Sequence, residues 1–301
     1  IDNTAPAIRA WFRQLKKIYK AGGKNTLICM EHMGTYLTFL VDILQKQKAQ
    51  LWLESPLVIK RSLGLLRGKS DQADSLRIAH FAFLNRKKAR LYVPPRQAVQ
   101  DLKQLEKLRL RLLHSIHRLE LPLKEKSVFS KKHTSQYMAQ QCAHSLKALE
   151  LDSKAVEKEM RAIVASDDRL QQLYTLITSV KYVGERLAMA LIVSTDEFKK
   201  FASAKALACY CGVAPFEYTS GTSVQGKARV SSFANKQLKA MLHMPALSAI
   251  VGKGELREYY LRKVAEGHSK MSVLNAVKNK LLHRVFACVR DNRLFEKNGH
   301  S

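Results

Sequence analysis

The first 95 residues alternate between short apolar runs and longer segments with helical periodicity. Three runs rich in β-forming residues are expected to be strands, at residues 26–29, 50–53 and 90–93. Three segments with apolar residues at helical spacing are expected to be helices, at residues 7–20, 36–46 and 71–86. Alternation of this kind is typical of parallel strands joined by crossover helices, so residues 1–95 predict an α/β domain with a thin sheet.

Residues 96–175 have a different pattern, because they are rich in leucine and charged residues and nearly free of glycine. Apolar residues recur at steps of three, four or seven in two stretches, one carrying Leu105 to Leu119 and the other Leu146 to Leu170. A break is expected within residues 121–134, which include Pro122. The pattern predicts an antiparallel helical hairpin or coiled coil. It leaves open whether the hairpin packs on itself or serves as a dimerisation arm.

Residues 176–301 are expected to be mainly helical, with a polar loop at 219–228 and basic helices after it. Residues 177–188 are typical of a helix-hairpin-helix, in which the turn presents backbone N–H groups to a nucleic-acid phosphate. Gly184 opens the second helix, whose N-terminus favours an anion. An ordinary turn between two helices is the alternative interpretation.

Charge points to the class of partner. Lysine and arginine number 52 against 25 aspartate and glutamate, a formal net charge of +27. A polyanion is the simplest partner for such a chain, and nucleic acid is preferred to a membrane because no run of 18 apolar residues and no signal peptide is found. The five cysteines form no C-x-x-C pair, which argues against a disulfide framework or a zinc site and fits a reducing cytosol.

Three carboxylates are candidates for metal binding. Glu31 ends the first apolar run, and a charged residue in that position lies at the carboxyl edge of the sheet, where active sites of α/β folds gather. Asp71 and Asp74 are spaced i, i+3 and therefore share one face of a helix. Like charges there are stabilised by a cation such as Mg²⁺, which prefers oxygen ligands. The alternatives are a salt-bridged or capping Glu31 and an ordinary acidic helix start at Asp71.

A polar segment between Gly221 and Gly226 precedes two cations, Lys227 and Arg229. Small residues allow close approach of a backbone to a phosphate, and a positioned serine hydroxyl can attack phosphorus. The two cations can neutralise charge that develops on the phosphate. A plain solvated loop has the same composition.

These features occur together, in this order, in one known family. The motifs are Glu31 after a strand, Lys69-Ser70-Asp71-Gln72-Ala73-Asp74, a leucine-rich helical middle, Val183-Gly184-Glu185, Cys211-Gly212-Val213-Ala214-Pro215 and Ser220-Gly221-Thr222-Ser223-Val224-Gln225-Gly226-Lys227. The chain resembles the DEDD transposases of bacterial insertion sequences that use a bridge RNA, relatives of the pilin-gene invertase. The resemblance runs from near Ile1 to about Arg293 and is most specific over residues 210–247.

The resemblance implies an RNase-H-like domain with four acidic residues at 1–95. Glu31 corresponds to the second acidic residue, Asp71 to the third and Asp74 to the fourth, and together they are expected to bind Mg²⁺. The first acidic residue is not assigned, because Asp2 lies just before a helix, and the domain is expected to lack its first strands. A helical coiled-coil middle at 96–175 and a mainly helical transposase domain with a helix-hairpin-helix at 176–301 complete the expected organisation.

The resemblance also implies the nucleophile and the partners. Ser220 is the expected nucleophilic serine, with Ser223 as the runner-up, while Gly184, Ser223, Lys227 and Arg229 are expected to contact nucleic acid. The expected partners are donor and target DNA, a structured guide RNA, and further copies of the chain in a dimer or tetramer. No membrane partner is expected, and the expected location is the bacterial cytoplasm, in association with the nucleoid.

Two other functions remain open at this stage. A metal-dependent junction-resolving nuclease would use the same carboxylates with water as the nucleophile. A non-catalytic nucleic-acid-binding protein would use the helix-hairpin-helix and basic helices alone. Trapped protein–DNA adducts separate transposition from the first alternative, and DNA cleavage of any kind excludes the second.

Overall fold

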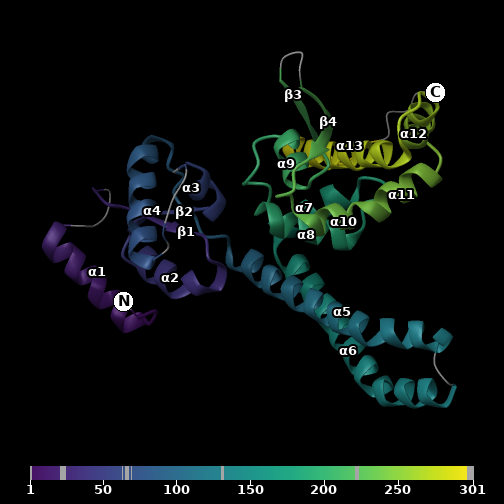
Figure 1. Ribbon diagram of the computed structural model, residues 1–301, viewed down its shortest axis with the longest axis horizontal. Coiled ribbons are helices and arrows are strands. Elements are labelled where there is room, and N and C mark those ends of the chain that lie inside the picture. The colour runs from purple at the N-terminus through teal and green to yellow at the C-terminus, as the bar shows by residue number, and fades with distance from the viewer. Residues whose placement is uncertain are drawn as a thin grey trace. The chain divides into compact units, whose positions relative to one another are not determined.

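Two structural units divide the chain between Pro94 and Pro95 in the computed structural model (Figure 1). The structure describes residues 2–20, 25–62, 64, 68, 70–129, 132–220 and 224–296, with backbone alone at 35, 126–129, 132, 217–220 and 224–229. Unit 1 is Ile1–Pro94 and unit 2 is Pro95–Ser301. The described part is mostly helical and includes a small parallel sheet in unit 1.

Unit 1 alternates helices and strands as its sequence pattern predicts. Its elements in chain order are α1 (Ala5–Tyr19), β1 (Leu27–Glu31), the 3-10 turn η2 (Gly34–Leu37), α2 (Thr38–Lys46), β2 (Gln50–Glu54), α3 (Pro56–Ser62), α4 (Asp71–Asn85) and the 3-10 turn η3 (Arg86–Lys88). Helix α3 had no counterpart in the sequence-based prediction. The described residues of the other helices and strands start and end within two residues of the predicted bounds, apart from the third strand.

The sheet of unit 1 consists of β1 and β2, which pair in parallel from Leu27–Gln50 to Glu31–Glu54. Alternate residues of a strand face opposite sides, so the two strands supply two small cores. On one face Met30 and Leu51 pack with residues of α1 and α2. On the other face Trp52 packs with Phe81 of α4, with ring centroids 5.1 Å apart. The prediction of parallel pairing with crossover helices is therefore confirmed.

The prediction of a third strand at residues 90–93 is wrong. This segment has no regular secondary structure, although Tyr92 N donates a hydrogen bond to Leu51 O of β2 at 2.6 Å. Pro94 and Pro95 follow immediately and have no N–H to donate. A strand ladder therefore does not form here, although the residue types favour strands.

Unit 2 begins with a long helical pair. Helices α5 (Gln97–Phe129) and α6 (Lys132–Ser166) pack along each other as an antiparallel hairpin, visible as the two long teal helices in Figure 1. Helix α5 continues past Pro122, so this proline does not end it. Residues 130 and 131, which fall within the predicted break, lie outside the described residues.

Helix α6 ends earlier than its apolar pattern predicted. The second predicted stretch included Leu170, but Leu170 belongs to a separate helix, α7 (Asp168–Thr178). Asp167 separates the two helices, and its side chain accepts a hydrogen bond from Leu170 N at 2.9 Å. An aspartate in this position starts a new helix by satisfying a backbone N–H of its first turn.

The rest of unit 2 packs helices around one large core. The remaining elements are α8 (Glu185–Thr195), α9 (Ala204–Tyr210), β3 (Pro215–Ser220), β4 (Val224–Val230), α10 (Lys236–Met241), α11 (His243–Val251), α12 (Glu255–Ala265) and α13 (Lys270–Asp291). Core residues such as Ile177, Leu191 and Leu281 are fully buried, and Val99 and Met160 of the helical pair join the same core. Across the described ranges, no helix is both long and apolar enough to cross a lipid bilayer.

The polar loop predicted at residues 219–228 is wrong, because most of this segment belongs to an antiparallel β-hairpin. Strand β3 pairs with β4 from Pro215–Val230 to Ser220–Val224, with an irregularity between Phe216 and Tyr218. Figure 1 shows the hairpin extending beside α9 and α13. Its strands are short and polar, and such strands lack the alternating apolar pattern by which a half-buried strand is recognised in sequence.

Candidate functional site

Glu31 lies at the carboxyl edge of the unit 1 sheet, as the sequence predicted. It is the last residue of β1 and shares the strand face of Leu27 and Cys29, which pack toward α4. The side chain of Glu31 is therefore on the face of the sheet that α4 covers. This is the helix that begins with Asp71.

Helix α4 brings the two aspartates into the same place. An open cleft of about 830 Å³ is lined by Glu31, Asp71 and Asp74 together with Arg86 and apolar side chains of β1, α2 and α4. Asp71 and Asp74 follow Glu31 by 40 and 43 positions in the sequence, and all three face one cavity because β1 and α4 pack against each other. This shared cleft is the main geometric feature that the three predicted carboxylates have in common.

The start of α4 is also a well-formed helix N-terminus. Ser70 caps it by accepting a hydrogen bond from Ala73 N at 3.2 Å, and Asp71 and Asp74 lie in the first turn, where negative charge is favoured. Asp74 Oδ1 also accepts a hydrogen bond from Arg77 Nη1 at 2.7 Å. Asp71 and Asp74 therefore form an ordinary acidic helix start and also line the cleft.

The donor set of the cleft suits a hard cation, since carboxylate oxygens are the ligands that Mg²⁺ prefers. In the described part of the chain, however, no three His, Cys, Asp or Glu side chains converge closely enough to hold a metal ion. Mg²⁺ commonly binds through one or two carboxylates and takes its other ligands from water and substrate phosphates. The carboxylates fit that incomplete type of site rather than an all-protein cage.

A fourth carboxylate, Glu54, lies at the same edge of the sheet. Glu54 is in register with Glu31 at the end of β2, and its carboxylate accepts hydrogen bonds from Trp52 Nε1 at 3.2 Å and from Ser55 N at 2.8 Å. The rule that located Glu31 also applies to Glu54, which follows the second predicted strand, but the sequence reasoning missed it.

Cys29 lines the cleft, and burial, with a smaller effect from the charge of Glu54, raises the pKa of its thiol to about 11. Cys29 is therefore a neutral thiol at physiological pH.

The predicted serine lies in unit 2, at the end of a β-strand. Ser220 is the last residue of β3 and pairs with Val224, the first residue of β4. Ser223 lies outside the described residues, and so do the side chains of Ser220, Lys227 and Arg229. The backbone thus places Ser220 beside the connection of the hairpin, with Lys227 and Arg229 on the opposite strand.

The base of the hairpin is fixed by close packing and hydrogen bonds. Gly212 has a φ of +66°, and a Cβ added there would lie 2.6 Å from the Cβ of Ala234. Asn275 Nδ2 of α13 donates to Val213 O at 2.9 Å, and Asn235 N donates to Tyr210 O at 2.8 Å. Glycine is needed at 212 both for its backbone conformation and for this close approach.

The predicted helix-hairpin-helix consists of α7, a turn at residues 179–184, and α8. Gly184 is the N-cap of α8, and no side chain accepts a hydrogen bond there from the first turn of the helix. A Cβ added to Gly184 would meet no atom within 4 Å, so the N-terminus is sterically open. Open backbone N–H groups at a helix N-terminus are the feature that favours an anion.

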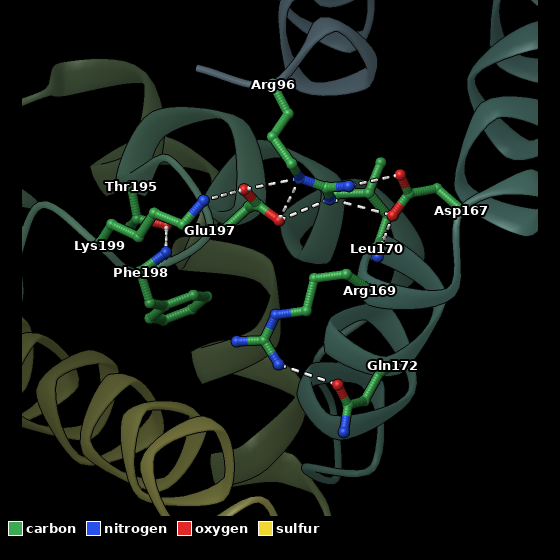
Figure 2. A network of polar contacts seen from close by, with 9 residues as sticks. All are labelled: Arg96, Asp167, Arg169, Leu170, Gln172, Thr195, Glu197, Phe198 and Lys199. Carbon is green, nitrogen blue, oxygen red and sulfur yellow. Dashed lines mark hydrogen bonds and ion pairs between the residues drawn. The ribbon is translucent and has the colours of Figure 1, made fainter. Parts of the chain in front are cut away.

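A charged network close to the start of unit 2 was not predicted from the sequence. Figure 2 shows the guanidinium of Arg96 between two carboxylates: it donates to Asp167 at 2.7 and 3.0 Å and to Glu197 at 2.6 to 3.2 Å. Lys199 Nζ donates to the same Glu197 at 2.6 Å. The Glu197 side chain is 0 % exposed, while that of Arg96 is 40 % exposed. The network ties the residue before α5 to the start of α7 and to the turn after α8.

The charges of this network stabilise one another. The hydrogen bond to Arg96 holds the pKa of the Asp167 carboxyl below its usual value. Burial alone would raise the pKa of Glu197, but hydrogen bonds from Arg96 and Lys199 outweigh it and lower that pKa. The pKa of Arg96 is raised, mainly by the hydrogen bond to Asp167. Arg96, Asp167 and Glu197 are therefore ionised at neutral pH, and their ion pairs connect three segments of unit 2.

Comparisons with known proteins give matches to two transposase family models. Residues 1–125 match a transposase model of the DEDD type, and residues 174–261 match the model described as "Transposase IS116/IS110/IS902 family". The pilin gene-inverting proteins of Moraxella bovis and Moraxella lacunata are each 24 % identical over 277 residues, which cover 91 % of this chain and 83 % of theirs. A protein of the insertion element IS110 from Streptomyces coelicolor is 30 % identical over 154 residues, 51 % of this chain and 37 % of that protein.

Proposed function

The chain belongs to the IS116/IS110/IS902 family of transposases, and on this basis we propose that it cuts and rejoins DNA through a covalent link to Ser220 under the guidance of a structured RNA. Family membership makes the chain a DNA-recombining enzyme. The observation that carries the proposal is the cleft of unit 1, where Glu31, Asp71 and Asp74 face one cavity. We further propose that unit 1 is an RNase-H-like catalytic domain.

The carboxylates of the cleft have the role of metal ligands in this proposal. Glu31, Asp71 and Asp74 would hold Mg²⁺ together with oxygens of the scissile phosphate and water. When bound, Mg²⁺ supplies positive charge opposite the phosphoryl oxygens that become more negative in the transition state. The ion pair of Asp74 with Arg77 orients this carboxylate at the rim of the cleft, where its side chain is 42 % exposed.

Ser220 is the proposed nucleophile. Its Oγ forms a bond to the phosphorus of one DNA strand, the bond from phosphorus to the departing DNA oxygen breaks, and that oxygen takes up a proton. A DNA hydroxyl then attacks the phosphoserine, a new DNA phosphodiester forms, and the serine hydroxyl is released with its proton restored. The number of phosphodiester bonds is conserved, so the exchange requires no nucleotide hydrolysis. Ser223 is the second candidate for the same role.

Backbone recognition is proposed for the rest of unit 2. The open N-terminus of α8 at Gly184 and the cations Lys227 and Arg229 on β4 would contact phosphates. The net charge of +27 suits a partner with a long phosphate backbone, and a structured guide RNA would supply sequence specificity by base pairing. This division of labour requires few base-reading side chains on the protein.

The helical pair α5–α6 is the proposed oligomerisation arm. It exposes large apolar side chains along its length, with Leu121, Tyr137 and Leu151 each more than half exposed. Exposed apolar residues on a long helical pair are well suited to a coiled-coil contact with another copy of the chain. We propose a dimer or tetramer that is held together by such contacts.

The test is a cleavage assay with the full chain, Mg²⁺, RNA transcribed from the DNA that flanks the gene, and a supercoiled plasmid carrying that flanking DNA. The proposal predicts strand cleavage that requires both RNA and metal and leaves protein attached to one DNA end. Cleavage that leaves free ends would favour the nuclease alternative with water as the nucleophile. Binding without cleavage would favour the non-catalytic alternative.

A further inference from the structure

Three segments of unit 2 converge where the serine hairpin begins. The segment 211–214 leads into β3, and it is held by Asn275 of α13 through Val213 O. Tyr210, one residue before the segment, is held by Asn235 at the start of α10, through both its carbonyl oxygen and its hydroxyl. The base of the hairpin is thus a rigid junction of α10, α13 and the chain between α9 and β3.

Two lysines lie at this junction. Lys278 is three residues after Asn275 and therefore shares the face of α13 that points toward the segment 211–214. Its residue exposure is 5 %, which places it among the core residues of unit 2. Lys239 is four residues after Asn235 on α10, and a Cβ built on Gly212 would lie 3.5 Å from its Cδ. The stems of both lysines are therefore packed into the junction.

Within the described side chains, neither lysine has an acidic partner. Burial, and then the positive charge of Lys239, lowers the pKa of Lys278. The ion pairs of the described residues include neither lysine. Other buried charges of unit 2 differ in this respect, since Arg109 is paired with Glu106 and Glu197 with Arg96. Two neighbouring cations without a counter-charge repel each other, and an anion that binds to both removes this repulsion.

We propose that Lys239 and Lys278 form a binding site for one backbone phosphate of the nucleic acid that runs past the serine hairpin. The inference rests on the proposed function, because it assumes that nucleic acid passes the hairpin. A phosphate carries negative charge and several acceptor oxygens, so one phosphate can accept hydrogen bonds from two neighbouring ammonium groups. The ligand chemistry is the phosphodiester shared by DNA and RNA.

The position of the site indicates a positioning role rather than a catalytic one. Ser220 is five residues beyond Pro215 along β3, about 17 Å at the usual rise of a strand. On one strand of a duplex this distance spans about five phosphates. A phosphate held at the base of the hairpin would therefore fix the register of the bound strand relative to the serine without taking part in bond exchange.

The test uses the full chain and three single variants. Lys278→Met keeps a buried apolar stem and removes the ammonium group, and Lys239→Gln removes the second charge. Lys236→Gln removes an exposed charge from α10, the helix of Lys239, and is the matched control. The probes are a mixed-sequence DNA duplex and a structured RNA hairpin, each labelled with fluorescein, with affinity measured at low salt. Melting temperatures are measured without nucleic acid.

The inference predicts opposite effects on stability and on binding. Lys278→Met should raise the melting temperature by about 2–4 °C, because it keeps the packing of the buried stem and removes the repulsion with Lys239. Lys278→Met and Lys239→Gln should each weaken binding of at least one probe by about tenfold, as expected for the loss of a charged hydrogen bond. Lys236→Gln should weaken binding of either probe by less than about threefold, which is the range expected for an exposed contact. The probe with the larger loss identifies DNA or RNA as the source of the phosphate.

Failure of the inference can be distinguished from failure of the proposed function. If the unmodified chain binds neither probe, the proposed function itself is wrong. If it binds, and Lys239→Gln binds both probes as tightly as Lys236→Gln does, the phosphate site is refuted. This comparison holds even if Lys278→Met fails to fold.

Discussion

Asp74 Oδ1 accepts a hydrogen bond from Arg77 Nη1 at 2.7 Å, so a carboxylate assigned to metal binding is held by a cation one turn along its own helix. The side chain of Arg77 is 20 % exposed and that of Asp74 is 42 % exposed. The ion pair orients the Asp74 carboxylate at the rim of the cleft that Glu31 and Asp71 also line. The cleft is thus a rigid arrangement of acidic groups on a capped helix and a strand end.

Replacement of either aspartate tests the role of the cleft. Asp71→Asn and Asp74→Asn should each lower the rate of DNA cleavage more than about a hundredfold, since a lost ligand removes several kcal/mol of charge stabilisation. Binding of nucleic acid should stay within about threefold, because the basic surface is unchanged. Asp42→Asn, an exposed carboxylate of α2 paired with Lys46, is the control and should cleave normally. Normal cleavage by both Asp71→Asn and Asp74→Asn would remove these residues from the active site.

The burial of Glu197 in the Arg96 network predicts how much this network stabilises unit 2. Arg96→Met should destabilise unit 2 by about 2–3 kcal/mol, because the fully buried Glu197 then has Lys199 as its counter-charge. The expected loss is smaller than for a fully buried ion pair, because Arg96 is partly exposed to solvent. Urea unfolding followed by circular dichroism measures the change. Arg290→Met removes an exposed ion pair with Asp291 and should leave the free energy of unfolding almost unchanged, because solvent screens this pair. Equal effects of the two variants would show that the network contributes no stability.

The same network predicts how stability depends on pH. The pKa values of Asp167 and Glu197 are lower in the folded protein than their ordinary values of 3.8 and 4.5. Their stabilising contribution is therefore complete above pH 4.5 and is lost as the pH falls through the lowered folded-state values. Melting temperatures of the unmodified chain should fall steeply below about pH 4.5. Arg96→Met should reduce this slope, and an unchanged slope would assign the acid sensitivity to other carboxylates.

Two glycines of unit 2 should respond very differently to alanine. Gly212→Ala places a Cβ 2.6 Å from Ala234 at a φ of +66°, and it should destabilise the protein by about 2 kcal/mol or more. Gly184→Ala adds a methyl group in open space at a φ of −92°, and it should change stability by less than about 1 kcal/mol. Thermal unfolding of both variants measures the difference. A strong loss at Gly184 with none at Gly212 would contradict the packing described for the hairpin base.

Much of unit 1 could be predicted because its elements have local signals. Leu27 to Met30 and Gln50 to Leu53 are short apolar runs, and Ser70 with Asp71 is a typical helix start. The prediction failed at residues 90–93, which form no strand although the residue types favour strands. Pro94 and Pro95 have no N–H, so a ladder could not continue beyond residue 93. The edge position of Glu31 was predicted from the strand before it, and in the structure Glu31 lines a cleft together with Asp71 and Asp74.

Other features depend on contacts between residues far apart in the sequence. Arg96, Asp167 and Glu197 are separated by up to 101 positions, so no local pattern identifies their network. The serine segment was predicted as a loop because its strands are polar and short, and pairing of β3 with β4 is a tertiary property. Lys278 is likewise an ordinary basic residue in the sequence of α13, and only its burial beside Lys239 distinguishes it.

The proposal of a serine nucleophile is tested most directly by trapping its covalent intermediate. A DNA substrate nicked just beyond the cleavage point should capture it in the assembled complex with RNA and Mg²⁺, because the strand needed for rejoining diffuses away. On a denaturing gel, part of the protein should migrate with DNA attached, and Ser220→Ala should abolish this band while Ser223→Ala retains it. Loss of the band in Ser223→Ala alone would keep the mechanism and move the nucleophile to Ser223. Cleaved DNA without any attached protein, from a complex that is active in cleavage, would contradict the covalent mechanism.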